Sequence, residues 1–487
     1  MPCHTIVHRQ DWFLEESYRA RTDREEPGFL DRSFELHFNE RPFLNHFSYL
    51  FITRTTKERM RQQSNFSVLC RGHILPREVR DKDGILRFLE AVEQFGRIIC
   101  DSGLVRLERL TTEEITGKGK EAGLVEKYFS LSQEDTTTLE DIRLGGAEMR
   151  VGDKRLSVHT LSDADGLPSA VRTDGRYEKY STDRSDCRLS FAAPVGLMLP
   201  YNHICNQYVF IDDPSETLRH FEKAARNMRS LSRYSRANEI NRQWTEEYLN
   251  EAHSFGLVPV RCHCNVMAWS EDRERLRNIR NDTGSALAQM GCKPRHNTVD
   301  APTLYWAGIP GGEGDFPAEE SFHTFIEQAA CLFIGETNHA SSLSPFGIKM
   351  ADRLSGRPIH LDISDEPMKR GITTNRNKFI LPLQMAAATL LPPLRPIATM
   401  AGTPCFSQTA KSRSLLSTTF TKPTGTPMTS AGRRPLSICS AIVSRAVGAL
   451  PTARMAPGCS CAAFFIAATA RVVPASFAAA ATSGSAM

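Results

Sequence analysis

The sequence predicts an α+β fold for residues 1–381, with mixed or antiparallel sheets packed against helices. Strand-like runs follow one another through short turns, as at 147–161 and 346–363, where apolar residues alternate around a glycine-containing turn. Helix-like runs, with apolar residues three or four positions apart, separate these strands, which is typical of a sheet with helices on one face. The length of 487 residues allows about two to four domains.

Strands are predicted where apolar, β-branched or aromatic residues run together between polar turns. The single strands are expected at 43–53, 104–110, 187–199, 205–212, 257–269, 303–307 and 379–381, and the two hairpins turn at Gly152 and Gly356.

Helices are predicted where a capping residue precedes a periodic apolar pattern. Asp213 before Pro214 is the clearest start, because the carboxylate accepts from backbone N–H groups and proline fits the first helical position. The expected helices span 83–103, 214–256 (one long helix or a helical pair), 271–290 and 318–333. The side chains expected to face inward from the last helix are Phe322, Phe325, Ile326, Ala329 and Phe333.

Charge is distributed unevenly along the chain. The formal net charge is +4, yet residues 382–487 contain nine basic and no acidic residues. The first 381 residues therefore hold 51 basic and 56 acidic groups, a net charge of −5. This slightly acidic balance gives no bulk electrostatic argument for nucleic-acid binding.

Cysteine usage and hydropathy indicate a protein of a reducing compartment. Nine of the thirteen cysteines lie before residue 382, at spacings too irregular for a disulfide framework. The first twelve residues mix His, Arg and Asp without an apolar run, which excludes a signal peptide there. A membrane-spanning segment needs about 18 or more apolar residues in a row, and the sequence has no such stretch.

Residues 379–381 lie where a nucleotide site of the P-loop type would begin. In such domains this strand opens into G-x-x-x-x-G-K-[ST], whose backbone amides, lysine and hydroxyl hold phosphates and Mg²⁺. Here no glycine follows Leu381 until Gly402, and no lysine until Lys411. We therefore expect the chain neither to bind nor to hydrolyse ATP, and no cofactor-binding, catalytic or metal residue is assigned.

Residues 382–487 differ from the rest in composition. They are rich in Ala, Ser, Thr and Pro, and they lack Asn, Asp, Glu, His, Tyr and Trp. Codons with A in the middle position are nearly absent, which indicates DNA read out of frame; a genuine low-complexity tail is the alternative. Because little apolar surface is available to offset chain entropy, we expect disorder, with weak helix around 461–471.

Long collinear stretches before residue 382 resemble the TraG-type ATPases of conjugative transposons, relatives of the type IV secretion motor ATPases. They include HRQDWFLEESY at 8–18, SFELHFNERPFLNHFSYLFITRTT at 33–56, LCRGHILPREVR at 69–80, YEKYSTDRSDCRLSFAA at 177–193 and NRNKFIL at 375–381. The resemblance covers about residues 4–381.

Two departures from the family matter. Its members carry a further N-terminal piece before the segment that resembles HRQDWF, and they continue from NRNKFIL into G-P-S-G-S-G-K-S and the motor domain. The resemblance therefore implies an N-terminal α+β region at 1–212, a helical and α+β region at 213–381 leading to the motor domain, and a tail at 382–487. In intact members of the family, the resemblance implies ATP and Mg²⁺ as cofactors.

The resemblance also implies a role in DNA transfer by conjugation. The expected function is an interaction module that docks the motor on the type IV secretion channel. Its expected partners are inner-membrane and cytoplasmic components of that apparatus, and its expected location is cytoplasmic, peripheral at the inner membrane.

Two local patterns suggest chemistry but favour plain structure. Cys262-His263-Cys264 could bind a metal, yet neighbouring strand residues point to opposite faces and no second cluster lies at zinc spacing. The glycine-rich run 308–314 has no lysine or hydroxyl in the phosphate-binding place, and Glu313 would repel phosphate. No G-x-S-x-G elbow supports a Ser/His/Asp site.

A basic stripe on the helix after Pro214 is the one candidate partner surface. Its members recur at helical spacing and are Arg219, Lys223, Arg226, Arg229, Arg233 and Arg236. The stripe is interpreted as a solvated helix face, as a surface for an acidic partner, or as a nucleic-acid-binding surface. Only Tyr234 is well placed to stack on single-stranded bases.

Without the two missing family pieces, strand edges and apolar faces should be open. Trp12 and Phe13 at one end, and Phe379 and Ile380 at the other, are expected to be exposed. Open edges with apolar faces favour association, so we expect self-association of residues 1–381 expressed alone.

Overall fold

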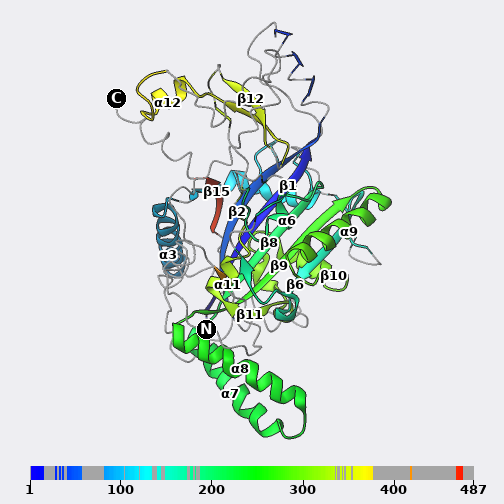
Figure 1. The fold of residues 1–487 in the computed structure, drawn as a ribbon, viewed down its shortest axis with the longest axis vertical. Helices are drawn as coiled ribbons and strands as arrows, with labels where there is room; N and C mark the ends of the chain where they lie inside the picture. The colour runs from blue at the N-terminus through cyan, green and yellow to red at the C-terminus, as the bar shows by residue number, and fades with distance from the viewer. Residues whose placement is uncertain are drawn as a thin grey trace, which may run out of the picture.

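The computed structural model describes most of residues 2–376, with its longest gaps at 16–27 and 57–81, and also residues 417–418 and 468–474. The described part is an α+β fold, as predicted. An 11-stranded sheet forms its middle, with strand order β3-β15-β2-β1-β8-β9-β6-β5-β4, and with β10 paired to β6 and β11 to β9 (Figure 1).

The strands of this sheet have the following bounds: β1 Pro2–Glu15, β2 Phe43–Thr56, β3 Val105–Arg109, β4 Ile142–Arg143, β5 Arg150–Val151, β6 Lys154–Leu161, β8 His203–Ile211, β9 Pro259–Ser270, β10 Arg295–Asn297, β11 Phe322–Phe325 and β15 Ala468–Pro474. All of their pairings are antiparallel.

Strand β1 lies at the centre of the sheet. It pairs with β2 along its whole length and with β8 from His4 to Trp12. Sequence patterning did not predict this strand, because both of its faces are buried and half of its residues are polar. Trp12 and Phe13, expected to be exposed, are buried. That expectation was wrong, because β1 is a central strand rather than an edge.

Helices cover both faces of the sheet, not one face as predicted. One face packs against α3 (Lys82–Asp101), α6 (Ala193–Gly196), α9 (Arg273–Gln289) and α11 (Ile326–Ala330). The other face packs against α5 (Leu124–Ser130), α10 (Ala301–Ala307) and the 3₁₀ turn η4 (Gly312–Asp315). A short helix, α4 (Thr112–Thr116), precedes α5.

An ion pair on β1 is fully buried beneath α5. Arg9 Nε donates to Asp11 Oδ1 at 2.5 Å, and Arg9 Nη2 donates to Asp11 Oδ2 at 2.9 Å. The Arg9 guanidinium lies 4.4 Å from the ring centroid of Tyr128, whose hydroxyl donates to the Tyr305 carbonyl at 2.7 Å. These contacts tie the sheet to α5 and α10.

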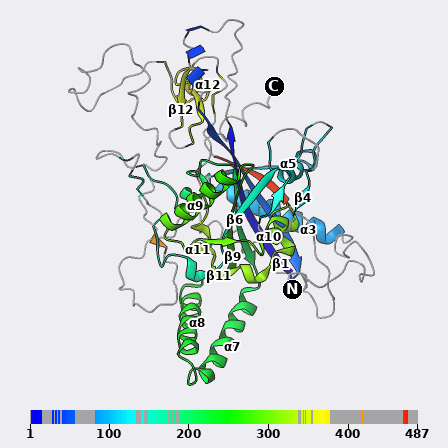
Figure 2. The same cartoon turned by 90° about the vertical axis from the view of Figure 1, so that its right-hand side faces the viewer.

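Two helices form an arm that leaves the body between β8 and β9. They are α7 (Pro214–Leu231) and α8 (Arg236–Phe255), so the helical pair anticipated from the sequence is confirmed. The arm projects from one end of the molecule (Figures 1 and 2). At the opposite end lie the hairpin of β12 (Ile348–Ala351) and β13 (Pro358–Leu361) and the helix α12 (Asp365–Lys369).

The predicted helices at 83–103 and 271–290, the hairpins at 147–161 and 346–363, and the strands at 43–53, 104–110, 205–212 and 257–269 are confirmed within a few residues. Three other predictions were wrong. Segment 187–199 contains helix α6, segment 303–307 belongs to helix α10, and segment 318–333 folds as 3₁₀ turn η5 (Ala318–Glu320), β11 and α11. A short apolar run is compatible with a strand and with a helix. Here residues 322–325 form a strand because they pair with the edge of β9.

Part of the tail joins the sheet. Residues of β15 pair with β2 from Ala468↔Ile52 to Arg471↔Tyr49, and with β3 from Ala470↔Arg109 to Pro474↔Val105. The expected helix at 461–471 is therefore wrong over its last four residues. Strand β14 (Ser417–Thr418) pairs with β7 (Val171–Arg172). The rest of 382–487, including the predicted disorder, and residues 379–381 lie outside the described part of the chain.

The sheet contains strands from both sides of residue 212. Strands β1, β2 and β8 come from the first region expected from the sequence, and β9 and β11 from the second. The division at 212 and 381 stays a prediction.

Removing the buried acid should test how far the sheet depends on its central ion pair. Asp11→Ala leaves the Arg9 guanidinium uncompensated inside the sheet, so we expect the free energy of unfolding to fall by about 3–5 kcal/mol. Urea unfolding followed by circular dichroism measures it.

The matched control is Glu113→Ala. It removes the exposed ion pair between Glu113 and Lys118, whose charged atoms lie 2.8 Å apart, and should cost at most about 1 kcal/mol. Similar losses in the two variants would show that the buried pair contributes nothing special to the sheet.

Candidate partner-binding surface

The arm begins with a strong local start signal. Asp213 accepts hydrogen bonds from the backbone N–H groups of Ser215 (2.9 Å) and Glu216 (3.2 Å), and Pro214 occupies the first helical position. The arm ends at Gly256, whose φ of 63° lies in the left-handed region that glycine adopts without strain.

The base of the arm is fixed by aromatic packing on β11. The ring of Tyr248 stacks on Phe325 at 4.5 Å between centroids, and Phe221 contacts both Tyr248 (4.9 Å) and His323 (4.8 Å). Leu249 and Ala252 of α8 are buried at the same end.

Ionic contacts lock the two strand ends from which the arm leaves. Arg261 of β9 donates from Nε to Asp212 at 3.0 Å and from Nη1 to the hydroxyl of Ser321 at 3.0 Å. Its guanidinium also lies 4.9 Å from the ring centroid of Phe210 in the neighbouring strand. The arm therefore leaves the sheet from a rigid base.

All six residues of the predicted basic stripe are exposed. Arg219, Lys223 and Arg226 share one face of α7, Arg229 lies in the last turn, Arg233 lies in the connecting turn, and Arg236 begins α8. Arg219 and Arg226 donate only to backbone carbonyls one turn earlier, those of Ser215 and Glu222. None of the six forms an ion pair with another residue that the structure describes.

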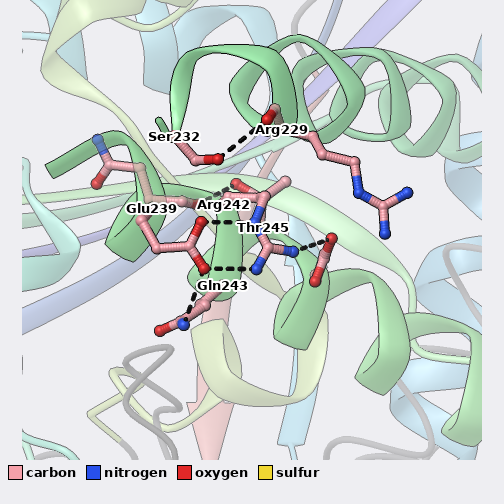
Figure 3. A network of polar contacts seen from close by, with 8 residues as sticks. Arg229, Ser232, Glu239, Arg242, Gln243 and Thr245 are labelled. Atoms are coloured by element: carbon pink, nitrogen blue, oxygen red, sulfur yellow. Dashed lines mark hydrogen bonds and ion pairs between the residues drawn. The ribbon is translucent and has the colours of Figure 1, made fainter. Parts of the chain in front are cut away.

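The second helix of the arm carries the opposite charge. Arg242 donates to both carboxylate oxygens of Glu239, at 3.0 and 2.6 Å, and to Glu246 at 2.5 Å (Figure 3). These hydrogen bonds lower the pKa of Glu239 and raise that of Arg242. In Figure 3 the guanidinium of Arg229 lies beside this network, and Arg229 is an exposed residue.

The Cys-His-Cys run is ordinary strand, as its alternation predicts. Cys262 and Cys264 face the cluster that includes α9 and α11, whereas His263 faces the other side and its Nδ1 lies 2.6 Å from the Glu320 carbonyl. Burial lowers the pKa of His263 to about 3. In the part of the chain that the structure describes, no group of three His, Cys, Asp or Glu side chains could hold a metal.

The glycine-rich run 308–314 lies against the sheet, where η4 contacts β2. A Cβ on Gly308 would lie 2.4 Å from the Tyr128 hydroxyl, and one on Gly312 would lie 2.6 Å from the Trp306 carbonyl. Glu313, which belongs to this run, is buried. Burial raises its pKa to about 8, although the backbone N–H groups of Glu313 and Gly311 partly offset the effect.

The hairpin at the far end of the molecule contacts the start of the sheet. Its turn is close to β2, where the backbone N–H of Leu44 donates to the Ser355 carbonyl at 3.0 Å. After β13, Asp362 accepts from the amides of Ser364 (2.8 Å), Asp365 (3.0 Å) and Glu366 (3.1 Å), which starts α12 and lowers the pKa of Asp362.

Residues 347–386, which begin with this hairpin, match the family model described as the TraG P-loop domain. The chain is a relative of the TraG-type conjugation ATPases. The match confirms the resemblance deduced from the sequence. No curated protein sequence matches this TraG relative.

Within the described residues of this TraG relative, no helix is both long and apolar enough to cross a membrane. The sequence predicted the basic stripe and its exposure. It missed the buried ion pair of β1, because a carboxylate two residues from an arginine on one strand is common at surfaces too. It also missed the exposed apolar residues at the end of the arm, such as Leu231.

The buried carboxyl of Glu313 gives the TraG relative a pH-dependent stability. Its folded pKa of about 8 lies above the ordinary 4.5, so the stability it contributes is complete below about pH 4.5 and is lost as pH rises through about 8. Glu313→Gln mimics the neutral acid and removes this dependence.

We therefore expect the stability of Glu313→Gln relative to the wild type to increase from pH 5 to pH 9, as measured by urea unfolding at each pH. Glu113→Gln, at an exposed position, is the control and should show no such trend. A constant difference across this range for Glu313→Gln would mean that Glu313 is ionised in the folded protein.

Proposed function

We propose that this TraG relative is an interaction module that docks a conjugation ATPase on the type IV secretion channel during DNA transfer. The observation that carries the proposal is the arm α7–α8. It is fixed at its base, it projects from the sheet, and its six exposed cations have no ionic partner among the described residues. Unpaired cations on a rigid projection suit recognition of an acidic partner, since their charge stabilises nothing within the fold.

The proposed partners are inner-membrane and cytoplasmic components of the conjugation apparatus, with the module at the cytoplasmic side of the inner membrane. The family relationship supports the link to conjugation. Self-association through open strand edges remains a further proposal; of its supposed apolar faces, Trp12 and Phe13 are buried.

Membranes from donor cells test the docking proposal. The full chain should sediment with inner membranes that contain the conjugation apparatus more strongly than with membranes from cells that lack it. Arg219→Glu with Arg226→Glu should abolish the difference, because reversal at the α7 face replaces attraction by repulsion.

The control for this experiment is Arg277→Glu, a reversal at an exposed position of α9 outside the arm. Equal sedimentation with both kinds of membrane, or equal loss with the control, would contradict docking through α7.

A nucleic-acid-binding module is the second candidate, because the same six cations could contact phosphates. Two observations weaken it. Glu246, Glu247 and Glu251 line the adjacent helix, and Tyr234 is the one exposed aromatic side chain beside the arginines of the turn. DNA binding that falls steeply as salt increases, and is lost with Arg219→Glu and Arg226→Glu, would favour this candidate.

We further propose that this chain does not bind ATP. In the ATPases that it resembles, ATP and Mg²⁺ are the cofactors. The residues after Leu381 do not fit a phosphate-binding loop, since glycine is absent until position 402 and lysine until position 411. No catalytic step is therefore assigned to any residue.

Thermal denaturation tests this point. A ligand that binds only the folded state raises the melting temperature, and the rise grows with the logarithm of ligand concentration above the dissociation constant. With Mg²⁺ present, ATP should leave the melting temperature of the full chain unchanged, as should the control GMP. A rise that grows with ATP concentration in this way, and that GMP does not cause, would show a nucleotide site elsewhere in the chain.

A further inference from the structure

The turn between α7 and α8 is the part of the arm farthest from the sheet (Figure 2), and apolar side chains are exposed there. Tyr234 is 86% exposed, Leu231 49% and Ile240 37%. A group of exposed apolar side chains rimmed by polar residues is typical of an interaction site. All three lie within residues 229–242, which we define as the arm tip.

The arm tip is an ordered turn in spite of this exposure. The N–H of Ser232 donates to the Met228 carbonyl at 2.8 Å, and the N–H of Tyr234 donates to the Leu231 carbonyl at 3.0 Å. Asn238 Nδ2 also donates to the Leu231 carbonyl, at 3.4 Å. Because local hydrogen bonds close the backbone, the apolar side chains are not needed to hold the turn together.

The arm tip is also strongly basic. It contains four arginines and one glutamate, and that glutamate, Glu239, is already bound to Arg242. Arg236 lies in the first turn of α8, where the helix dipole disfavours a positive charge. The charge at this place therefore opposes local stability and suits an external anionic surface.

The distribution of charge along the arm separates two kinds of anionic partner. A nucleic acid lying along the arm would meet Glu246, Glu247 and Glu251 on α8, and it would gain little from exposed leucine and isoleucine. A membrane surface would meet only the tip. Basic residues beside exposed leucine and tyrosine are typical of segments that insert between lipid headgroups, where tyrosine is enriched.

We propose that the arm tip binds the surface of an anionic membrane directly. Leu231 and Tyr234 enter the headgroup region, and Arg229, Arg233 and Arg236 contact lipid phosphates. The inference deepens the proposed docking function by adding a lipid contact to the protein contact of the α7 face, and it rests on that function only for the place where the module acts.

Flotation of the full chain with protein-free vesicles tests the inference. The chain should float with vesicles of phosphatidylcholine and phosphatidylglycerol but not with phosphatidylcholine alone. Each arginine near an anionic surface strengthens binding about fivefold, so Arg233→Gln with Arg236→Gln should weaken it at least about tenfold. Leu231→Ser with Tyr234→Ser should weaken it several-fold at unchanged charge.

Two control variants are matched to these changes. Arg219→Gln with Lys223→Gln removes the same charge at the base of α7 and should weaken flotation less than the tip pair. Phe255→Ser removes an apolar side chain that is 73% exposed at the base of α8, and it should have no effect. A melting curve for each variant confirms that the chain is folded.

Flotation that is absent, or that tip and base variants reduce equally, would overturn the inference. The proposed docking has a separate outcome, because it requires apparatus proteins that these vesicles lack. If the chain binds lipid vesicles but sediments equally with membranes that contain or lack the apparatus, the docking proposal fails and the lipid-binding inference stands. Binding to DNA fragments in place of vesicles, lost with the tip variants, would assign the arm tip to nucleic acid instead.

Discussion

The pairing of strand β1 on both of its edges is the constraint on which the rest of the structure depends. Its backbone groups are satisfied by β2 and β8, and both of its faces are buried, so its polar side chains need partners inside the protein. Arg9 and Asp11 pair on one face. On the other, His8 lies 2.9 Å from the Ser48 hydroxyl, and Gln10 donates to the Ile334 carbonyl at 2.9 Å. The bond of Gln10 joins the first strand to a residue 324 positions later.

The arm inherits its rigidity from this sheet. It connects β8 to β9, which are adjacent antiparallel strands, and the last pair of that ladder is Phe210↔Arg261. The two ends of the arm are therefore held one strand spacing apart. Arg261, after the arm, also donates hydrogen bonds to Asp212, before the arm, and to Ser321. A helical hairpin fixed in this way presents its basic face and its tip in a defined direction, which lowers the entropic cost of binding a partner.

Much of the fold was predictable where sequence patterning reflects a single environment. The cap at Asp213, and the alternation around Gly152 and Gly356, predicted the right elements because local chemistry and tertiary packing agree there. Strand β1 was missed because a central strand buried on both faces, with polar residues, has no alternation. The run at 303–307 was misassigned because a short apolar run fits a strand or a helix. The run at 322–325 was misassigned because its conformation depends on pairing with β9, which a local pattern does not show.

The sequence predicted the candidate surface as one stripe of six cations. It did not predict that the stripe divides into a face of α7 and the arm tip. Helical spacing identifies Arg219, Lys223 and Arg226 as one face, and it cannot reveal that the helix breaks at Leu231 and turns the remaining arginines toward the tip. Exposure of Leu231 and Tyr234 depends on what lies beyond the turn, which is solvent here. The basic face and the basic tip thus became separate features only through the fold.

Hydrogen exchange of the full chain tests the central claim most directly, because it locates the contact without altering any residue. Exchange would be compared for the free chain, and for the chain bound to inner membranes that contain the conjugation apparatus. The account predicts slower exchange in α7 and in the turn at 229–242, with the sheet amides of β1 and β8 unchanged. Unchanged exchange throughout the arm, with protection appearing elsewhere, would contradict it.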